Sequence, residues 1–298
     1  MAVLSGKTAV VTGATNGIGK VTALELAKQG ARVIVVGRSA EKVEQTVSEI
    51  KTAAGNPNIN GVVADLSLMA DVRALAVTLK ASYPRIDLLI NNAGAYFTAR
   101  ELTSEGLERT FALNHISYFL LTTLLLDTLI ASAPVRIVNV SSDAHSAAAL
   151  DFDDLQAEKS FNGFGMYSRS KLMNLYFTYE LARRLAARGI TADQVSVNAV
   201  HPGFVDSGFF KGKKSRATMI VNLIKPLFKV MKVMVSPDQG AQTTLYVATS
   251  PETAGISGAY FSNSKLAKSN PVSYDESAAK RLWAISEQIT GVGEAVAR

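Results

Sequence analysis

A tyrosine and a lysine at i and i+4, Tyr167 and Lys171, are the two side chains of this chain best suited to proton transfer. They stand at the head of the apolar stretch 172–177, which is typical of a buried helix, so they should share one helix face. A free phenol titrates near ~10, and a neighbouring cation favours the phenolate and lowers that pKa. The pair therefore predicts an acid–base catalyst for alcohol or carbonyl chemistry, with a lowered Tyr167 pKa. An ordinary surface pair is the alternative, because this spacing arises by chance on many helices.

A glycine-rich turn follows the first apolar run, 8–12, and opens an amphipathic pattern that reaches Gln29. In that setting Gly13 permits a tight turn, Gly17 lets the backbone approach a pyrophosphate, and Gly19 lets helix and sheet pack closely. The start of the helix adds N–H groups and a positive dipole end. The turn therefore predicts a dinucleotide site, and a purely structural turn is the alternative. Its other candidate cofactor contacts are Thr15, Asn16 and Ile18.

The residues after the second apolar run, 32–36, indicate which dinucleotide is bound. A carboxylate at this place bonds the ribose 2′-OH of NAD, whereas an arginine accommodates the 2′-phosphate of NADP. This chain has Arg38, and its first acid, Glu41, already belongs to the next helical pattern. Arg38 can bind a phosphate with two charge-assisted hydrogen bonds. We therefore expect NADP(H) rather than NAD(H), with a solvated loop arginine as the alternative.

Apolar runs rich in Val and Ile alternate with helical patterns along the whole chain. Because most runs are continuous rather than alternating, the strands should be buried on both faces. Strands separated by helices imply right-handed crossovers and a parallel sheet. The expected strands are 8–12, 32–36, 61–64, 86–90, 135–140, 194–200 and 258–261, and the expected helices are 17–29, 40–53, 69–82, 104–130 and 166–188. No linker or repeat divides residues 1–298, so we expect one α/β domain, a single-domain Rossmann fold with a doubly wound parallel sheet and helices on both faces.

The amino-acid composition excludes several kinds of catalytic and metal site. The chain has 298 residues, 48% of them hydrophobic, and contains no cysteine. Disulfides, thiolate nucleophiles and cysteine-ligated metals are thereby excluded. The three histidines lie far apart and show no HExxH spacing, so no metal site is expected. We expect helix packing for His115 and loop hydrogen bonding for His145 and His201.

The apolar segments favour a cytoplasmic protein. Residues 1–7 become polar too quickly for a signal peptide. The longest apolar run, 119–130, is shorter than a bilayer crossing and is typical of a core helix. The lack of cysteine also fits the cytosol.

The net charge of +6 comes from one stretch, 211–232, which holds seven cations and no acid. The rest is nearly balanced, which argues against a nucleic-acid surface. Apolar residues recur at three- and four-residue steps across 220–234, and Pro226 should kink or divide this cationic amphipathic segment. One interpretation is a lid over an apolar pocket with solvated lysines outside. The other is a lid that also rests on an anionic membrane surface, as a peripheral contact. We favour the first.

From about residue 6 to about residue 261 the motifs resemble those of the short-chain dehydrogenases/reductases, in the order typical of that family. Besides the glycine turn they are Asp65-Leu66, Asn91-Asn92-Ala93-Gly94, Asn114, Asn139-Val140-Ser141-Ser142, Tyr167 to Lys171, and His201-Pro202-Gly203. The chain is most similar to the retinol dehydrogenase branch, through residues 111–115, 119–122, 140–145, 154–156 and 199–203. Branches that reduce steroids, quinones or protochlorophyllide share several of these features, although the lack of cysteine argues against the light-driven protochlorophyllide reductases.

The resemblance implies a catalytic role for four residues. Tyr167 donates a proton to the carbonyl oxygen during reduction and removes it during oxidation. Lys171 lowers the Tyr167 pKa and bonds the nicotinamide ribose. Ser142, rather than Ser141, holds the substrate oxygen and stabilises charge that develops on it. Asn114 places a water that relays protons from Lys171 to solvent.

The resemblance also implies the rest of the cofactor site and the substrate lid. Asp65 and Leu66 should lie beside the adenine, and Asn92, Ala93 and Gly94 should line the cofactor, together with Asn91. Pro202 and Gly203 should pass near the nicotinamide amide, with Val205 and Ser207 close by, although the family often has a threonine where this chain has Val205-Asp206-Ser207. Residues 204–236 should form the substrate lid. Relatives often pair through the helices that hold Asn114 and Tyr167, which suggests a homo-oligomer.

The sequence thus predicts an NADP(H)-dependent oxidoreductase that interconverts a small lipophilic carbonyl compound and its alcohol, with retinal and retinol as first candidates. A broad carbonyl reductase for aromatic aldehydes, quinones or steroids is the alternative enzyme. A cofactor-binding regulatory protein without catalysis is the alternative from another class, and the complete set of Ser142, Tyr167 and Lys171 argues against it.

Overall fold

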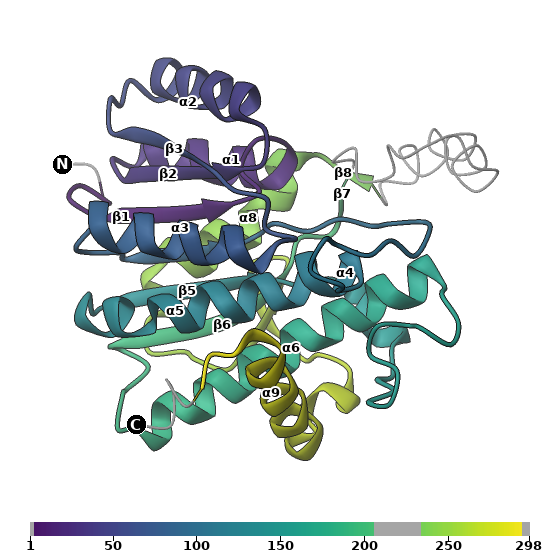
Figure 1. Cartoon of the computed structure of the whole chain (residues 1–298). Coiled ribbons are helices and arrows are strands. Elements are labelled where there is room, and N and C mark those ends of the chain that lie inside the picture. The colour runs from purple at the N-terminus through teal and green to yellow at the C-terminus, as the bar shows by residue number, and fades with distance from the viewer. Residues whose placement is uncertain (1–2, 206–233, 294–298) are drawn as a thin grey trace.

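One sheet of eight strands, in the order β10-β9-β6-β5-β4-β1-β2-β3, forms the centre of the fold (Figure 1). The computed structural model describes residues 3–205 and 234–293. All neighbouring strands in this sheet are parallel except β9 and β10, which are antiparallel. The strands are β1 (Thr8–Thr12), β2 (Arg32–Gly37), β3 (Ile59–Val63), β4 (Leu88–Asn91), β5 (Val135–Val140), β6 (Val195–His201), β9 (Tyr260–Ser262) and β10 (Lys265–Ala267). The expected parallel sheet is confirmed, with β10 as an additional antiparallel edge strand.

The central strands are buried almost along their whole length, as their continuous apolar runs predict. Every residue of β1 and β4 is buried, and β2, β5 and β6 each have a single residue that is not. The edge strand β3 differs, because only Ile59 of its five residues is buried. The expectation of burial on both faces is therefore wrong for β3, whose polar Asn60 and small Gly61 suit the rim of a sheet.

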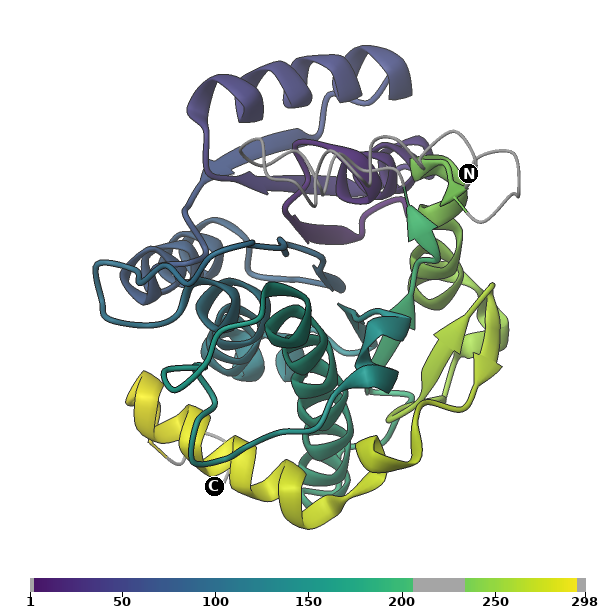
Figure 2. The same ribbon diagram turned by 90° about the vertical axis from the view of Figure 1, so that its right-hand side faces the viewer.

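Helices cover both faces of the sheet, as expected (Figures 1 and 2). On one face Val11 and Val35 pack with α1 (Gly17–Lys28), α2 (Ala40–Ala54) and α8 (Pro237–Thr249). On the other face Val10 and Ile34 pack with α3 (Met69–Ser82), α5 (Ser117–Ala131), α6 (Gly163–Ala187) and α9 (Glu276–Thr290). Alternate residues of one strand thus enter opposite cores, as the period of two in a strand requires.

Helices α8 and α9 were not expected from the sequence, although both carry local start signals. Ser236 caps α8 by accepting from the Gln239 N–H at 3.2 Å, with Pro237 in the first turn. α9 packs across α6 (Figures 1 and 2). Its Trp283 ring stacks on Phe177 at 5.8 Å and meets Phe119 edge-on at 4.9 Å. The C-terminal helix therefore covers part of α5 and α6.

The helix expected to begin at residue 104 begins at Arg109. The buried Glu108 carboxylate accepts hydrogen bonds from the Thr110 and Phe111 N–H groups at 2.9 and 2.8 Å, which sets the first turn, α4 (Arg109–Phe111). The helical segment Arg109–Ala131 has 23 residues and includes the apolar run 119–130, which by itself is shorter than a bilayer crossing. It is the one membrane-span candidate found in the described part of the chain, by length and composition only. Since 72% of its apolar window is buried inside the protein, it fits the core helix that we expected.

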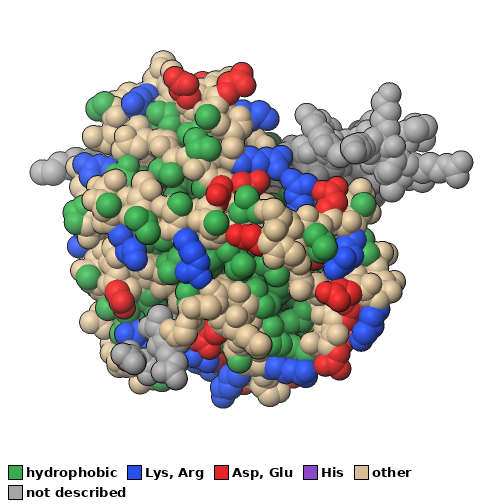
Figure 3. Space-filling model, viewed as in Figure 1, with side chains coloured by type: hydrophobic (Ala, Val, Ile, Leu, Met, Phe, Trp, Pro, Cys, Tyr) green, Lys and Arg blue, Asp and Glu red, His purple; other side chains and the backbone are tan. Residues whose placement is uncertain are grey.

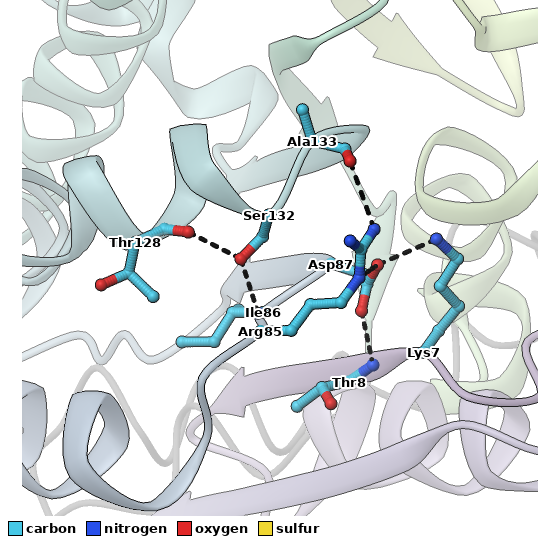
Figure 4. Close-up of polar contacts among 8 residues, drawn as sticks. All are labelled: Lys7, Thr8, Arg85, Ile86, Asp87, Thr128, Ser132 and Ala133. Atoms are coloured by element: carbon cyan, nitrogen blue, oxygen red, sulfur yellow. Dashed lines mark hydrogen bonds and ion pairs between the residues drawn. The ribbon is translucent and has the colours of Figure 1, made fainter.

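A buried carboxylate, Asp87, anchors the amino end of β4, at the opposite end of the strand from the glycine turn (Figure 4). Asp87 accepts hydrogen bonds from the Lys7 Nζ at 2.9 Å, the Thr8 N–H at 2.9 Å and the Arg85 Nε at 2.7 Å. Nearby, Ser132 accepts from the Ile86 N–H at 3.1 Å and so ties the end of α5 to the same place. These contacts hold β1, β4 and α5 in register without reaching the other end of the sheet.

The cationic segment 211–232 lies outside the described residues, as does most of the expected lid 204–236. On the face shown in Figure 3, acidic and basic side chains are mixed. The choice between a simple lid and a lid that touches a membrane therefore stays a prediction.

Candidate active site

The glycine turn and the loop after β4 meet where the strand order reverses, because β1 has β2 on one side and β4 on the other. The crevice at the carboxyl ends of such strands is where open α/β sheets bind ligands. Thr12 Oγ1 accepts from the N–H groups of Asn92 and Ala93 at 2.9 and 3.0 Å. Asn92 Nδ2 in turn donates to the Thr12 carbonyl at 2.8 Å. These bonds fix the two loops against each other.

Two glycines of the turn lie where a side chain would collide with neighbouring backbone. Gly13 has φ +63°, and a Cβ there would lie 2.8 Å from the Ala93 Cα. A Cβ on Gly19 would lie 2.5 Å from the Gly13 carbonyl oxygen. Gly17, with φ +52°, opens α1, and the Asn16 side chain makes no capping bond to that helix in the described structure. The first N–H groups of α1 are therefore suited to bind an anion.

Beside this turn, Thr15 and Arg38 lie at the ends of β1 and β2. A Cβ on Gly37 would lie 2.5 Å from Thr15 Cγ2, so the Thr15 side chain packs against the end of β2. Arg38 is exposed and forms no ion pair with the described residues. Ile18 is partly buried at the start of α1. Arg38 is therefore placed beside the turn with its guanidinium available to a ligand.

Asp65 and Leu66 follow β3, at the same carboxyl ends of the strands as the glycine turn. The Asp65 carboxylate accepts from the Ser67 N–H at 3.0 Å and from its hydroxyl at 2.7 Å. The Asp65 N–H donates to Asp71 at 2.9 Å, and Leu66 is buried. Asp65 thus shapes a turn, and its contact with an adenine stays a prediction.

Ser142, Tyr167 and Lys171 come together at the end of β5. Ser142 is the second residue after β5, and its hydroxyl is hydrogen-bonded to Tyr167 on α6. Lys171 Nζ lies 5.6 Å from the centroid of the Tyr167 ring and donates to the Val140 carbonyl at 2.9 Å. The Ser141 hydroxyl donates to the Lys171 carbonyl at 2.8 Å, so β5 and α6 are joined beside the site.

The electrostatics differ from the expectation of a lowered Tyr167 pKa. Burial raises the pKa of Tyr167 to about 12, and the hydrogen bond with Ser142 opposes that rise only in part. Burial lowers the pKa of Lys171 to about 7. Removal from water disfavours both charged forms, so the lysine gives the phenol little help in the protein alone. The pKa of Tyr167 is raised, against the predicted direction, because desolvation outweighs the hydrogen bond with Ser142.

Asn114 lies in a π-helical turn, η1 (Ala112–Ile116), between α4 and α5. Its amide accepts from the Ala95 N–H at 2.9 Å and donates to the Ala95 carbonyl at 3.0 Å. It also donates to Ser170 Oγ at 3.0 Å. A Cβ on Gly94 would lie 3.4 Å from both Asn114 Oδ1 and Lys171 Nζ, so the two side chains flank Gly94 together. π-turns are frequent at functional sites, and the water-relay role stays a prediction.

Three neighbours of the site were not among the expected site residues. Thr12 holds the two loops together, as described above. The Tyr118 ring on α5 lies 5.9 Å from Lys171 Nζ, opposite a second ring, Tyr167. Tyr96 meets the Tyr167 ring edge-on at 6.3 Å. Only Tyr118 had a sequence signal, because it stands at i+4 from Asn114.

The turn after β6 reaches the same edge of the sheet. Pro202 and Gly203 lead into β7 (Phe204–Val205), which pairs with β8 (Met234–Val235). Gly203 has φ +82°, and a Cβ there would lie 3.1 Å from Val235. The side chain of Val205 and all of Ser207 lie outside the described residues. Their contact with a nicotinamide therefore stays a prediction.

The histidines contribute hydrogen bonds. His115 Nε2 lies 2.9 Å from Ser286 Oγ on α9, which fits the expected helix packing, and burial lowers the pKa of His115 to about 3. His201 Nδ1 accepts from the Asp143 N–H at 3.2 Å, and His145 bonds two loops, as expected for both. Within residues 3–205 and 234–293, no cluster of three acids or histidines could hold a metal.

Known proteins resemble this chain over most of its length. The model of the short chain dehydrogenase family matches residues 7–218. Human retinol dehydrogenase 14 is 41% identical and aligns with 97% of this chain and 88% of its own length. An uncharacterized protein from Mycobacterium paratuberculosis has a TM-score of 0.75 at 30% identity, covering 96% of this chain and 94% of that one. The Pseudomonas aeruginosa RhlG/NADP active-site complex has a TM-score of 0.68 at 27% identity, covering 87% and 95%.

These similarities extend across the segments that form the crevice, from the glycine turn to α6. They agree with the architecture, a mostly parallel sheet with helices on both faces. The chain therefore belongs to the short-chain dehydrogenase/reductase family, in its retinol dehydrogenase-like branch, whose members are oxidoreductases of alcohols and carbonyl compounds.

Proposed function

We propose that this chain uses NADP(H) to interconvert a lipophilic aldehyde or ketone and its alcohol, with retinal and retinol as first candidates. The observation that supports it best is the meeting of Ser142, Tyr167 and Lys171 at the carboxyl end of β5, beside the glycine turn. A surface Tyr–Lys pair would need neither the Ser142 bond nor the burial of Lys171, which is 3% exposed.

The chain's own residues supply the proton transfer. In carbonyl reduction the Tyr167 hydroxyl donates its proton to the substrate oxygen, which becomes the alcohol oxygen, and Ser142 stabilises charge on that oxygen. In oxidation the same phenol receives the proton back. When bound, the reduced nicotinamide supplies the hydride to the carbonyl carbon. Lys171 and Asn114, which flank Gly94, are the groups that would pass the next proton towards Tyr167.

The choice of NADP(H) rests on Arg38. It follows β2 directly, where a dinucleotide's adenosine ribose lies in this type of fold. Its guanidinium is exposed and unpaired among the described residues, so it can bind a 2′-phosphate without breaking an internal ion pair. The similarity to a structure with bound NADP supports the same choice.

A lipophilic substrate is supported by apolar side chains at the same edge of the sheet. Phe164 precedes Tyr167 by one helical turn and is 55% exposed, and Phe204 on β7 is 44% exposed. Exposed aromatic groups near a polar reaction centre favour a ligand with an apolar body and one polar end. Retinal has that form, and the similarity to a retinol dehydrogenase points the same way.

Three further proposals concern the setting of the protein. We propose a cytoplasmic location. We also propose that residues 211–232 contact a membrane surface, which co-sedimentation of the protein with anionic liposomes would test. Pairing of two copies through α5 and α6 also remains a proposal. Because α9 lies against α6, such a dimer would have to include α9 or displace it.

The test is oxidation of NADPH and of NADH, followed by absorbance, with a panel of retinal, aromatic aldehydes, quinones and steroid ketones. We expect turnover of retinal with NADPH and a strong preference for NADPH over NADH. Arg38→Ala should weaken NADPH use by about 10- to 100-fold and leave NADH use unchanged, because charged hydrogen bonds contribute about 1.5–3 kcal/mol. Equal use of both cofactors would refute the NADP assignment. Turnover of the whole panel would favour the broad carbonyl reductase, and binding of NADPH without any turnover would favour the regulatory protein.

A further inference from the structure

His145 occupies a buried position between the candidate catalytic serine and the C-terminal segment. It lies in the short 3₁₀ turn η2 (Asp143–Ala147), which begins directly after Ser142. The side chain is 1% exposed, and its ring meets Tyr260 of β9 edge-on with centroids 5.3 Å apart. None of the proton-transfer steps above uses this ring.

Both nitrogens of the ring have one partner each. His145 Nδ1 lies 2.6 Å from the Ser142 carbonyl oxygen. His145 Nε2 lies 3.0 Å from the backbone N–H of Asn270, the residue that caps the 3₁₀ turn η4 (Pro271–Tyr274). Asn270 and Ser142 are far apart in sequence, so the imidazole joins the end of β5 to the segment between β10 and α9.

The partners decide which nitrogen carries the proton. A carbonyl oxygen can only accept, so Nδ1 must be the N–H donor. A backbone N–H can only donate, so Nε2 must present a lone pair. The ring is therefore the neutral Nδ1–H tautomer, because a second proton would place two donors against each other at Asn270. The titratable groups around it are Asp143 in the same turn, His201 on β6 and Tyr260 on β9, and the Asp143 N–H already bonds His201.

The contact acts on the residue whose hydroxyl reaches Tyr167. The Ser142 carbonyl accepts from the His145 backbone N–H at 3.1 Å as well as from Nδ1, while Ser142 Oγ accepts from the Ala144 N–H at 3.3 Å. These bonds fix both the carbonyl and the hydroxyl oxygen of Ser142 against η2, and the hydroxyl also bonds Tyr167 on α6. A hydroxyl that stabilises developing charge is effective when its direction is fixed beforehand.

We propose that His145 is a positioning residue, which as the neutral Nδ1–H tautomer orients Ser142 and couples it to the Asn270 turn. The proposal rests on the proposed function, since it takes Ser142 to be the residue that holds the substrate oxygen. The Asn270 N–H sets the tautomer by occupying Nε2, and the Nδ1–H is the group that acts on Ser142.

Two substitutions of His145 each keep one of its two hydrogen bonds and remove the other. In His145→Asn the amide nitrogen occupies the place of Nδ1 and can donate to Ser142, but nothing reaches Asn270. In His145→Gln the amide oxygen occupies the place of Nε2 and can accept from Asn270, but the donor to Ser142 is lost. We expect kcat to fall about tenfold in His145→Gln, with the KM for NADPH unchanged, and to stay within about threefold of wild type in His145→Asn.

A purely structural link would give the reverse pattern. His145→Asn would then lose thermal stability together with activity, and His145→Gln would keep both. Equal losses of kcat in the two variants, or a loss confined to His145→Asn, would overturn the proposal.

The tautomer has a readout that is independent of turnover. Long-range ¹H–¹⁵N spectra of histidine-labelled protein should show three rings, with the signals that vanish in both variants belonging to a neutral Nδ1–H imidazole. An Nε2–H tautomer or a charged ring for His145 at pH 7 would overturn the proposal. If the wild-type protein turned over no carbonyl compound while the spectrum showed the expected tautomer, the proposed function would fail and the structural link would stand.

Discussion

Thr12→Val should weaken the fold and the cofactor site together. Thr12 is the last residue of β1, is 1% exposed and donates its hydroxyl proton to the Ile90 carbonyl at 3.2 Å. The same oxygen accepts from the N–H groups of Asn92 and Ala93. Valine has nearly the same shape but offers no acceptor, so both N–H groups lose their partner.

The magnitude follows from those two groups. A buried N–H left without an acceptor costs about 1–3 kcal/mol, and Asn92 is only partly buried, so we expect a loss of about 2–4 kcal/mol in the free energy of unfolding. Since the loop 92–94 lines the proposed cofactor crevice, its release should weaken NADPH binding about tenfold. Thr12→Ser is the matched control. It keeps the hydroxyl and removes one methyl group, which costs about 1 kcal/mol.

Urea unfolding followed by circular dichroism, with NADPH titration of each variant, measures both effects. If Thr12→Val and Thr12→Ser differed by less than about 0.5 kcal/mol in unfolding and bound NADPH equally, the two N–H groups would have other acceptors. The reasoning that connects β1 to the loop after β4 would then be wrong.

Tyr167→Phe should lower kcat at least ~100-fold with the NADPH Kd unchanged, because a positioned acid contributes about 10²–10⁴ to the rate; a variant with most of the wild-type rate would contradict the role. Asp87→Asn should lower the free energy of unfolding by about 2 kcal/mol and should leave kcat of the folded enzyme unchanged. The loss is smaller than for a fully buried ion pair because the side chains of Lys7 and Arg85 are 35% and 41% exposed. The pKa of His115 falls from 6.5 to about 3 on folding, so the unfolded chain binds the extra proton between these values and stability is lost as pH falls through this window. Unfolding free energies should therefore drop by roughly 2 kcal/mol from pH 7 to pH 5, and His115→Gln should lack that part of the slope; an equal slope in both proteins would show that His115 is not the group responsible.

The central strands of the sheet could be predicted from local patterns in the sequence. β1, β2, β5 and β6 have the continuous apolar runs that only strands covered on both faces can bury. The elements that were missed lie near the C-terminus, where α9 has a polar surface face and β10 is only three residues long. α9 becomes a distinct element only once Trp283 packs on Phe177 and Phe119.

The glycine turn and the pair of Tyr167 and Lys171 could be predicted from local spacing, at the end of a strand and on one helix face, whereas Ser142 came from the resemblance to the family. The tertiary structure decided what surrounds them. Burial raises the pKa of Tyr167 instead of lowering it, a second ring, Tyr118, approaches Lys171, and His145 connects Ser142 to Asn270. Desolvation and long-range hydrogen bonds depend on segments that are remote in the chain, so no local pattern in the sequence could have predicted them.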